Sequence, residues 1–241
     1  MYFLLSGEGP TDMGLCPDNM TACEGSRHQQ GPMAIIVSQI VEQELNFSFM
    51  ETRYYGYVSK RELVSRASGF KNQNRSLKLP GVNIPKETRY FYQNARALAL
   101  CAKDKMEELA DDVIAVLFHD SDGTASAGRG HWQDIWNSMV NGFLAEGFEQ
   151  GVPMIPKPKS EAWIICSVKN NPYQGCNALE NRSGNDDSPN ALKDELAEIL
   201  HGRPSRVQLC EMVSDRRIDC EKIDMPSFLA FKDRLLTLIG R

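Results

Sequence analysis

An unbroken apolar run, Val113–Phe118, constrains the fold of this chain more than any other segment. A run of this length and composition predicts a strand buried on both faces, as in a parallel sheet covered by helices. The residues that follow it are His119, Asp120, Ser121, Asp122, Gly123 and Thr124. Ligands bind at the carboxyl ends of the strands in such sheets. Asp120 and Asp122 would repel each other there unless a proton or a hard divalent cation neutralises them, so we expect phosphate chemistry at this point.

Apolar periodicity along the rest of the chain predicts alternating strands and helices, and therefore an α/β fold. Strands are predicted at residues 2–6, 47–58, 113–118 and 152–155. Helices are predicted at residues 33–45, 87–110, 132–145, from 160 onward, 191–201 and 227–239, with Ser160 as a helix N-cap. Because strands alternate with helices, we expect the first three strands to be mostly parallel.

Composition along the chain indicates two parts. We expect residues 1–168 to form the α/β catalytic domain and residues 169–241 to form a mainly helical C-terminal extension. The boundary is predicted in the polar, turn-rich stretch at residues 170–190. Residues 53–89 are expected to be a basic insertion without a long regular element, because Gly69 and two prolines interrupt it.

Cysteine usage and hydropathy predict a cytoplasmic protein without membrane contact. No apolar run approaches the roughly 20 residues that span a bilayer. The chain has seven cysteines, an odd number, and no C-x-x-C pair, which favours free thiols in a reducing compartment. A zinc site at Cys16, Cys23 and His28 is disfavoured because the gap between the two cysteines is not a usual ligand spacing.

The charge of the chain is unevenly distributed. The net charge is −5, but residues 53–89 hold nine basic and two acidic side chains, a local charge of +7 that leaves −12 for the remainder. Tyrosines and phenylalanines are interleaved with these cations, as in surfaces that contact nucleic acid. The candidate contact residues are Lys60, Arg61, Arg66, Lys71, Arg75 and Lys78. A solvated loop explains the same composition equally well, and the sequence leaves both interpretations open.

Acidic residues also follow two other predicted strands. Glu8 lies between two glycines just after the first strand, and Asp12 follows in the same loop. Glu161 comes after the strand at 152–155, beside Lys157 and Lys159, which are suited to neutralising charge on a phosphate. Each acid alone is typical of a turn or of a helix N-terminus. Their coincidence at three strand ends favours one shared metal site with the aspartates after the 113–118 strand.

With Gly7-Glu8-Gly9-Pro10-Thr11-Asp12 and Asp120-Ser121-Asp122-Gly123 identified, residues 1–165 resemble a Toprim domain. This is the Rossmann-like catalytic module of topoisomerases, primases and OLD-family nucleases. The chain is most similar to small, stand-alone bacterial Toprim-like proteins that are related to OLD nucleases and linked to mobile elements or phage defence. The resemblance implies a Rossmann-like, mostly parallel sheet with helices on both faces.

The resemblance also implies a function, namely Mg²⁺- or Mn²⁺-dependent hydrolysis of phosphodiester bonds in nucleic acid. It assigns Glu8 to acid/base or metal chemistry, and Asp120 and Asp122 to metal binding. Asp12 is the counterpart of a further acidic residue, and Lys159, or alternatively Lys157, is the counterpart of a late catalytic lysine. No G-x-x-x-x-G-K-[ST] motif occurs, so an ATPase partner would be a separate chain.

Two other functions are considered. A catalytically silent subunit of a defence or toxin-like system would use the same fold to bind a protein or nucleic acid. Alternatively, Asp120-Ser121-Asp122-Gly123-Thr124 resembles the first motif of haloacid-dehalogenase-type phosphatases, with Asp120 as nucleophile and Asp122 as acid/base. We rank the phosphatase lower, because its motif normally opens the domain and because Glu8 would then have no role.

Overall fold

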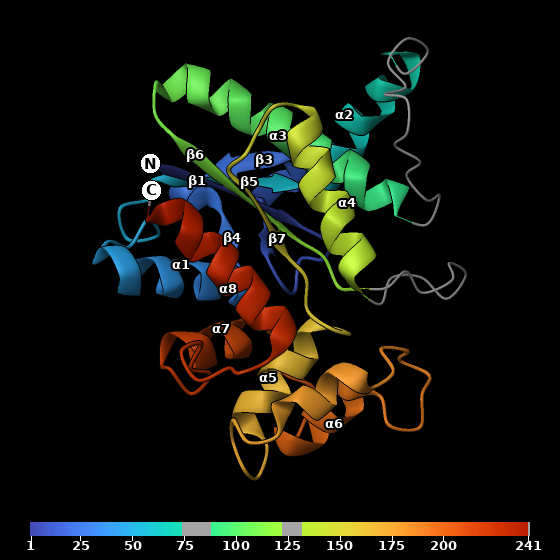
Figure 1. Cartoon of the computed structure of the whole chain (residues 1–241). Coiled ribbons are helices and arrows are strands. Elements are labelled where there is room, and N and C mark those ends of the chain that lie inside the picture. The colour runs from blue at the N-terminus through green and yellow to red at the C-terminus, as the bar shows by residue number, and fades with distance from the viewer. Residues whose placement is uncertain (74–87, 122–131, 241) are drawn as a thin grey trace.

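A five-stranded mixed sheet forms the centre of the molecule (Figure 1). The computed structural model describes residues 1–73, 88–121 and 132–240, except for the side chains of residues 71–73. The strands, in the order in which they lie in the sheet, are β3 (Ala22–Glu24), β5 (Tyr55–Ser59), β1 (Tyr2–Gly7), β6 (Val113–Phe118) and β7 (Gly151–Met154). A separate ribbon pairs β2 (Gly14–Leu15) with β4 (Gln29–Gln30) in antiparallel fashion.

Four strands of the sheet run parallel, and the edge strand β3 runs antiparallel to β5. Gly7 at the end of β1 lies beside Ser59 of β5 and Phe118 of β6, and Phe118 lies beside Met154 of β7. The carboxyl ends of these strands therefore meet at one end of the sheet. The predicted α/β class and the predicted parallel arrangement of the first three strands are confirmed. A Toprim-specific version of the fold stays a prediction.

Helices cover both faces of the sheet (Figure 1). One face carries α1 (Pro32–Leu45) and α8 (Pro226–Ile239), and the other carries α2 (Lys60–Gln73), α3 (Arg89–Leu109) and α4 (Trp132–Ala145). The remaining helices are α5 (Ser160–Val168), α6 (Leu192–Ile199), α7 (Arg206–Ser214) and the 3-10 turns η1 (Pro17–Asn19), η2 (Gly25–Arg27) and η3 (Cys176–Asn181). Within the described ranges, no helix combines the length and apolar character needed to cross a membrane.

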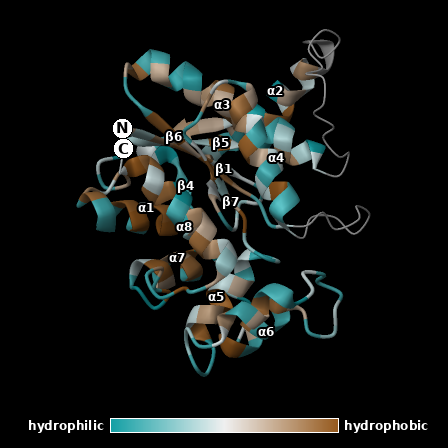
Figure 2. Ribbon diagram, in the orientation of Figure 1, coloured by the Kyte–Doolittle hydropathy of each residue, from teal (hydrophilic) through white to brown (hydrophobic). Residues whose placement is uncertain are grey.

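The period-two alternation of the strands divides the core into two layers. In β1, Phe3 and Leu5 pack with α1 and α8, whereas Tyr2 and Leu4 pack with α3. Every residue of β1 and β6 is buried, which explains why most of their side chains are apolar, and the hydroxyl of Ser6 in β1 donates to the carbonyl oxygen of Val58. In Figure 2 the apolar colouring accordingly runs through the strands and over much of α1 and α8.

The C-terminal extension contributes to the same core as the sheet. Trp163 of α5 is fully buried, its ring lies 5.0 Å from Phe228 and 6.2 Å from Phe231 of α8, and its indole N–H donates to Ser227 Oγ at 2.9 Å. Helix α8 packs against β7 and α1. A division at residue 168 stays a prediction, but the part after it shares buried side chains with the part before it.

Two sequence predictions for the segment 47–73 were wrong. Residues 60–73 form helix α2 despite Gly69, because Leu63 and Phe70, seven residues apart, bury the same helix face. The predicted strand at 47–58 is shortened to β5, because Phe49 turns inward to stack on Phe3 at 4.3 Å and Arg53 adopts a left-handed conformation (φ 59°).

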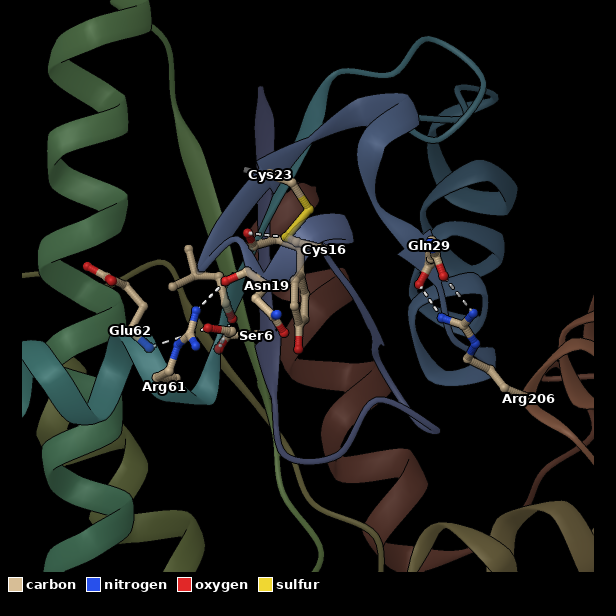
Figure 3. The surroundings of a disulfide bond; sticks show 11 residues. Ser6, Cys16, Asn19, Cys23, Gln29, Arg61, Glu62 and Arg206 are labelled. Atoms are coloured by element: carbon tan, nitrogen blue, oxygen red, sulfur yellow. Dashed lines mark hydrogen bonds between the residues drawn. A yellow bond between two sulfur atoms is a disulfide. The ribbon is translucent and has the colours of Figure 1, made fainter.

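The prediction that all seven cysteines are free thiols was also wrong. Cys16 pairs with Cys23, and Cys166 pairs with Cys176, which leaves Cys101, Cys210 and Cys220 free. Figure 3 shows the first disulfide beside the loop that precedes β3. Sequence spacing gave no indication of these pairs, because the antiparallel edge strand and the turn after α5 bring the partners together.

We predict that the unfolded, unreduced protein has three titratable thiols and that full reduction raises this number to seven. Replacing Cys16 and Cys23 with Ala should lower the free energy of unfolding by about 2–3 kcal/mol, because the link constrains the unfolded chain. Thiol titration in guanidinium and urea unfolding measure these effects. Seven thiols before reduction would contradict the pairing.

Candidate functional site

Acidic side chains from three separate chain segments gather at the carboxyl end of the sheet. Glu8 directly follows β1, and Asp120 lies two residues beyond β6. Glu8 Oε1 accepts a hydrogen bond from the backbone N–H of Asp120 at 3.3 Å, although the two residues are 112 positions apart. Parallel pairing of β1 with β6 therefore brings together the two acidic motifs identified from the sequence.

Ser160, the first residue of α5, links two of the carboxylates. Its hydroxyl donates to Asp12 Oδ1 at 2.6 Å, and its backbone N–H donates to Asp120 Oδ1 at 2.9 Å. The predicted N-cap role of Ser160 was wrong, because Lys159 occupies the cap position without a side-chain cap hydrogen bond. Asp120 instead binds the free N–H at the start of the helix from a remote loop.

Burial and mutual repulsion make two of these carboxyl groups hard to ionise. Burial raises the pKa of Asp12 to about 6; the hydrogen bond from Ser160 and the charge of Lys193 lower it, and the charges of Glu161 and Glu8 raise it further. Burial also raises the pKa of Asp120 well above its ordinary value, and Asp12, Glu161 and Glu8 add to the effect. Each ionised carboxylate therefore disfavours the ionisation of its neighbours, and a bound proton or cation relieves this repulsion.

Glu8 has a different environment and remains ionised. Burial on its own would raise its pKa, but hydrogen bonds and charges from His119 and Lys60 outweigh burial and hold the pKa below its ordinary value. His119 Nδ1 lies 2.8 Å from Glu8 Oε1 and 2.7 Å from the carbonyl oxygen of Asp120. Both neighbours are acceptors, so Nδ1 carries a hydrogen. The His119 ring packs on Phe91 at 4.4 Å, which fixes its position.

The lysine and glutamate predicted from the 156–161 motif lie in different surroundings. Glu161, in the first turn of α5, has a buried Oε2 without a hydrogen-bond partner among the described residues. Lys159 Nζ instead pairs with Asp186 Oδ1 at 2.7 Å, and Lys193 Nζ pairs with Asp186 Oδ2 at 2.7 Å. Glu161 is therefore available to the carboxylate group, whereas Lys159 contacts the C-terminal extension.

The C-terminal extension lines the cavity beside the carboxylates. A cavity of about 210 Å³ is lined by Asp12, Asp120 and Glu161, together with Lys193 and Arg203 of the extension. The hydrogen bond with Asp186, with the charges of Glu161 and Asp120, raises the pKa of Lys193 and keeps it protonated. Sequence reasoning missed both cations, because no local motif marks them and only the packing of the extension brings them here.

The basic residues predicted to bind nucleic acid do not share one environment. Lys60 Nζ pairs with Glu8 Oε2 at 3.3 Å and lies 5.4 Å from the centre of the Tyr90 ring, so it belongs to the site. Arg61 donates to the carbonyl oxygen of Asn19 (Figure 3). Arg66 pairs with two carboxylates on the α2–α3 side.

Four predicted residues cannot be placed fully. Arg75, Lys78 and Asp122 lie outside the described residues, and the side chain of Lys71 does too.

The donor set suits a hard divalent cation. Carboxylate oxygens are the ligands that Mg²⁺ prefers, and Glu8, Asp12, Asp120 and Glu161 supply them within one buried, mutually repelling group. Among the described residues, no three Asp, Glu, His or Cys side chains form a preformed metal-binding group.

No protein-family model matches this chain, and comparisons with curated proteins and with solved structures find no match either.

We predict that Asp12→Asn stabilises the protein at pH 8 without divalent cations. The pKa of Asp12 is higher in the folded protein, about 6, than its ordinary value of 3.8, so the folded state binds the proton more tightly and loses stability as the pH rises between these values. The variant should gain up to about 3 kcal/mol at pH 8 and nothing at pH 4. Urea unfolding at both pH values measures this, with the exposed Asp233→Asn as control. An equal effect of Asp12→Asn at both pH values would contradict the account.

Proposed function

We propose that the protein is a divalent-metal-dependent nuclease that hydrolyses phosphodiester bonds in nucleic acid, of Toprim or OLD-like type. The observation that carries this proposal is the meeting of Glu8, Asp12 and Asp120 at the carboxyl end of a parallel sheet. Ligand sites in α/β sheets lie at this end. The raised pKa values of Asp12 and Asp120 supply a physical reason for a cation to bind there.

In this proposal some of the carboxylates hold the cation, whereas Glu8 and His119 form a pair that transfers protons. Asp12, Asp120 and Glu161 would hold Mg²⁺ or Mn²⁺, together with Asp122 from outside the described residues. A bound cation of this kind lowers the pKa of water and stabilises charge on a leaving oxygen. Ser160 keeps the carboxylates of Asp12 and Asp120 in fixed positions through its two hydrogen bonds.

Glu8 and His119 form the proton-handling pair. Glu8 is ionised and accepts a hydrogen bond from His119 Nδ1, so the contact orients the imidazole ring. This arrangement suits Glu8 for acid/base chemistry, for metal binding, or for both.

The cations around the cavity support a phosphate-bearing substrate. Lys193 and Arg203 line the same cavity as Asp12, Asp120 and Glu161, so an anionic phosphate bound there would meet both cations and the metal. Lys60 supplies a further cation through its ion pair with Glu8. Lys159 and Lys193 both pair with Asp186, but of the two only Lys193 lines the cavity, so Lys193 is the better-placed lysine.

The contact between Glu8 and Asp120 favours a nuclease over a haloacid-dehalogenase-type phosphatase. In the phosphatase, Asp120 acts as an ionised nucleophile and Glu8 has no role. Here Glu8 accepts a hydrogen bond from the backbone N–H of Asp120, so it lies within the site.

Two further parts of the proposal concern the biological setting. A role in bacterial phage defence, with a separate ATPase chain as partner, comes from the resemblance of the two acidic motifs to OLD-type proteins. A cytoplasmic location stays a prediction, and the two disulfides take up four of the seven cysteines whose free thiols supported it.

We predict that Asp120→Asn and Glu8→Gln each lower Mn²⁺-dependent cleavage of nucleic acid by at least about 100-fold. Asn keeps the acceptor for the Ser160 N–H, so the fold should persist, as thermal unfolding will verify. The matched control Asp233→Asn, at an exposed position of α8, should retain full activity. The assay follows labelled single- and double-stranded DNA and RNA in Mg²⁺ or Mn²⁺.

Undiminished cleavage by Asp120→Asn would contradict the nuclease proposal. Metal binding in calorimetry without cleavage of any of these substrates would support the silent binding subunit instead.

A further inference from the structure

A second cavity, of about 490 Å³, lies on the α2–α3 face of the sheet next to the edge strand β3. None of its lining residues borders the cavity beside Asp12 and Asp120, so it is independent of the proposed nuclease site. Its floor is formed by β1, β5 and α3 and is largely apolar, with Leu4, Val58 and Cys101. Its rim carries charged side chains from β3, α2 and α3.

The floor contains a buried hydroxyl group without a protein partner. Tyr2 is 3% exposed, and its Oη makes no hydrogen bond with the described residues. The side chain of Tyr2 crosses the neighbouring strand β5 at Gly56. A Cβ atom added to Gly56 would lie only 2.5 Å from Tyr2 Oη. Gly56 pairs with Glu24 of β3, so the hydroxyl points toward the edge strand and the cavity. A buried polar atom without a partner is costly and marks a position where a ligand can supply the partner.

The rim has more carboxylates than its cations neutralise. Its charged residues are the acids Glu24, Glu62, Asp104 and Glu108 and the bases Arg27, Arg66 and Lys105. Arg66 is shared by Glu62 and Asp104, at 3.2 and 2.7 Å. Lys105 is shared by Glu24 and Glu108. Each shared cation leaves one carboxylate charge in excess, and Arg27 offsets one of these two charges, so the four acids exceed the three bases by one.

The negative potential reaches the floor of the cavity. Burial raises the pKa of Tyr2, and the charges of Glu24 and Glu108 raise it further, so the phenol stays protonated. Its oxygen lone pairs remain able to accept a hydrogen bond from a ligand.

The chain itself shows how an ammonium group is held at this position. Lys105 Nζ pairs with Glu24 and Glu108 and lies 6.0 Å from the centre of the Tyr2 ring. An ammonium group near carboxylates and an aromatic face gains both ionic and cation–π attraction. Carboxylates accept several hydrogen bonds each, so Glu24 and Glu108 have acceptor capacity left.

We propose that this cavity binds a small organic amine, with its apolar part against Leu4 and Val58 and its ammonium group among Glu24, Glu108 and the hydroxyl of Tyr2. The excess of carboxylates selects a cation, the apolar floor selects an organic body, and the buried hydroxyl accepts a hydrogen bond. The site is separate from the nuclease proposal and does not depend on it.

The proposal is tested by titrating the full-length protein with 2-phenylethylamine, and with the neutral 2-phenylethanol as the matched probe, by NMR chemical-shift changes or calorimetry. We expect saturable binding of the amine and at least about 10-fold weaker binding of the alcohol. Tyr2→Phe removes only the unpartnered hydroxyl, so it should fold as well as the parent and weaken amine binding by about 3- to 10-fold. Glu24→Gln should also weaken it.

Lys105→Gln gives a sharper readout, because it removes the competing ammonium group and should tighten amine binding at least about 3-fold. A purely structural role of Lys105 predicts no such gain. No saturable amine binding, equal binding of amine and alcohol, or no gain in Lys105→Gln would each overturn the proposal. If Asp120→Asn abolished amine binding and Tyr2→Phe left it unchanged, the amine would bind at the carboxylates of the proposed nuclease site. This result would also overturn the proposal.

Discussion

The parallel pairing of β1 with β6 is the constraint on which the rest of the site depends. It sets Gly7 beside Phe118, so that the residues just after both strands emerge at the same end of the sheet. Glu8 and Asp120 then contact each other. Both strands are buried along their whole length because helices cover both faces, and this burial fixes the pairing. The repulsion among several desolvated carboxylates at the site therefore follows from the pairing of these two buried strands.

Helix α5 connects this constraint to the C-terminal extension. Its first residue, Ser160, holds Asp12 and Asp120, and its Trp163 is buried against α8. The helix therefore links the site to the extension, which adds Lys193 and Arg203 to the cavity wall. The C-terminal extension carries no recognisable motif, yet it contributes cations to the site and packs into the core that it shares with the sheet.

Sequence reasoning predicted what depends on local pattern and missed what depends on packing between distant segments. The strand at 113–118 and the helix at 132–145 were predicted at their observed bounds, because burial on both faces and a regular apolar period are strong signals. Helix α7 was missed although its capping box, Ser205 with Gln208, is a readable signal. The disulfides, the link through Ser160 and the cations of the extension were not predictable, because each joins residues that only the fold brings together.

The central claim is that carboxylates from the start and the middle of the chain form one cation site. The most direct measurement is a crystal structure with bound Mn²⁺, located by its anomalous scattering. The account predicts a Mn²⁺ ion within coordination distance of Asp120 and of at least one of Glu8 and Asp12. An ion bound elsewhere, or carboxylates of Glu8 and Asp120 that point away from each other in the crystal, would contradict it.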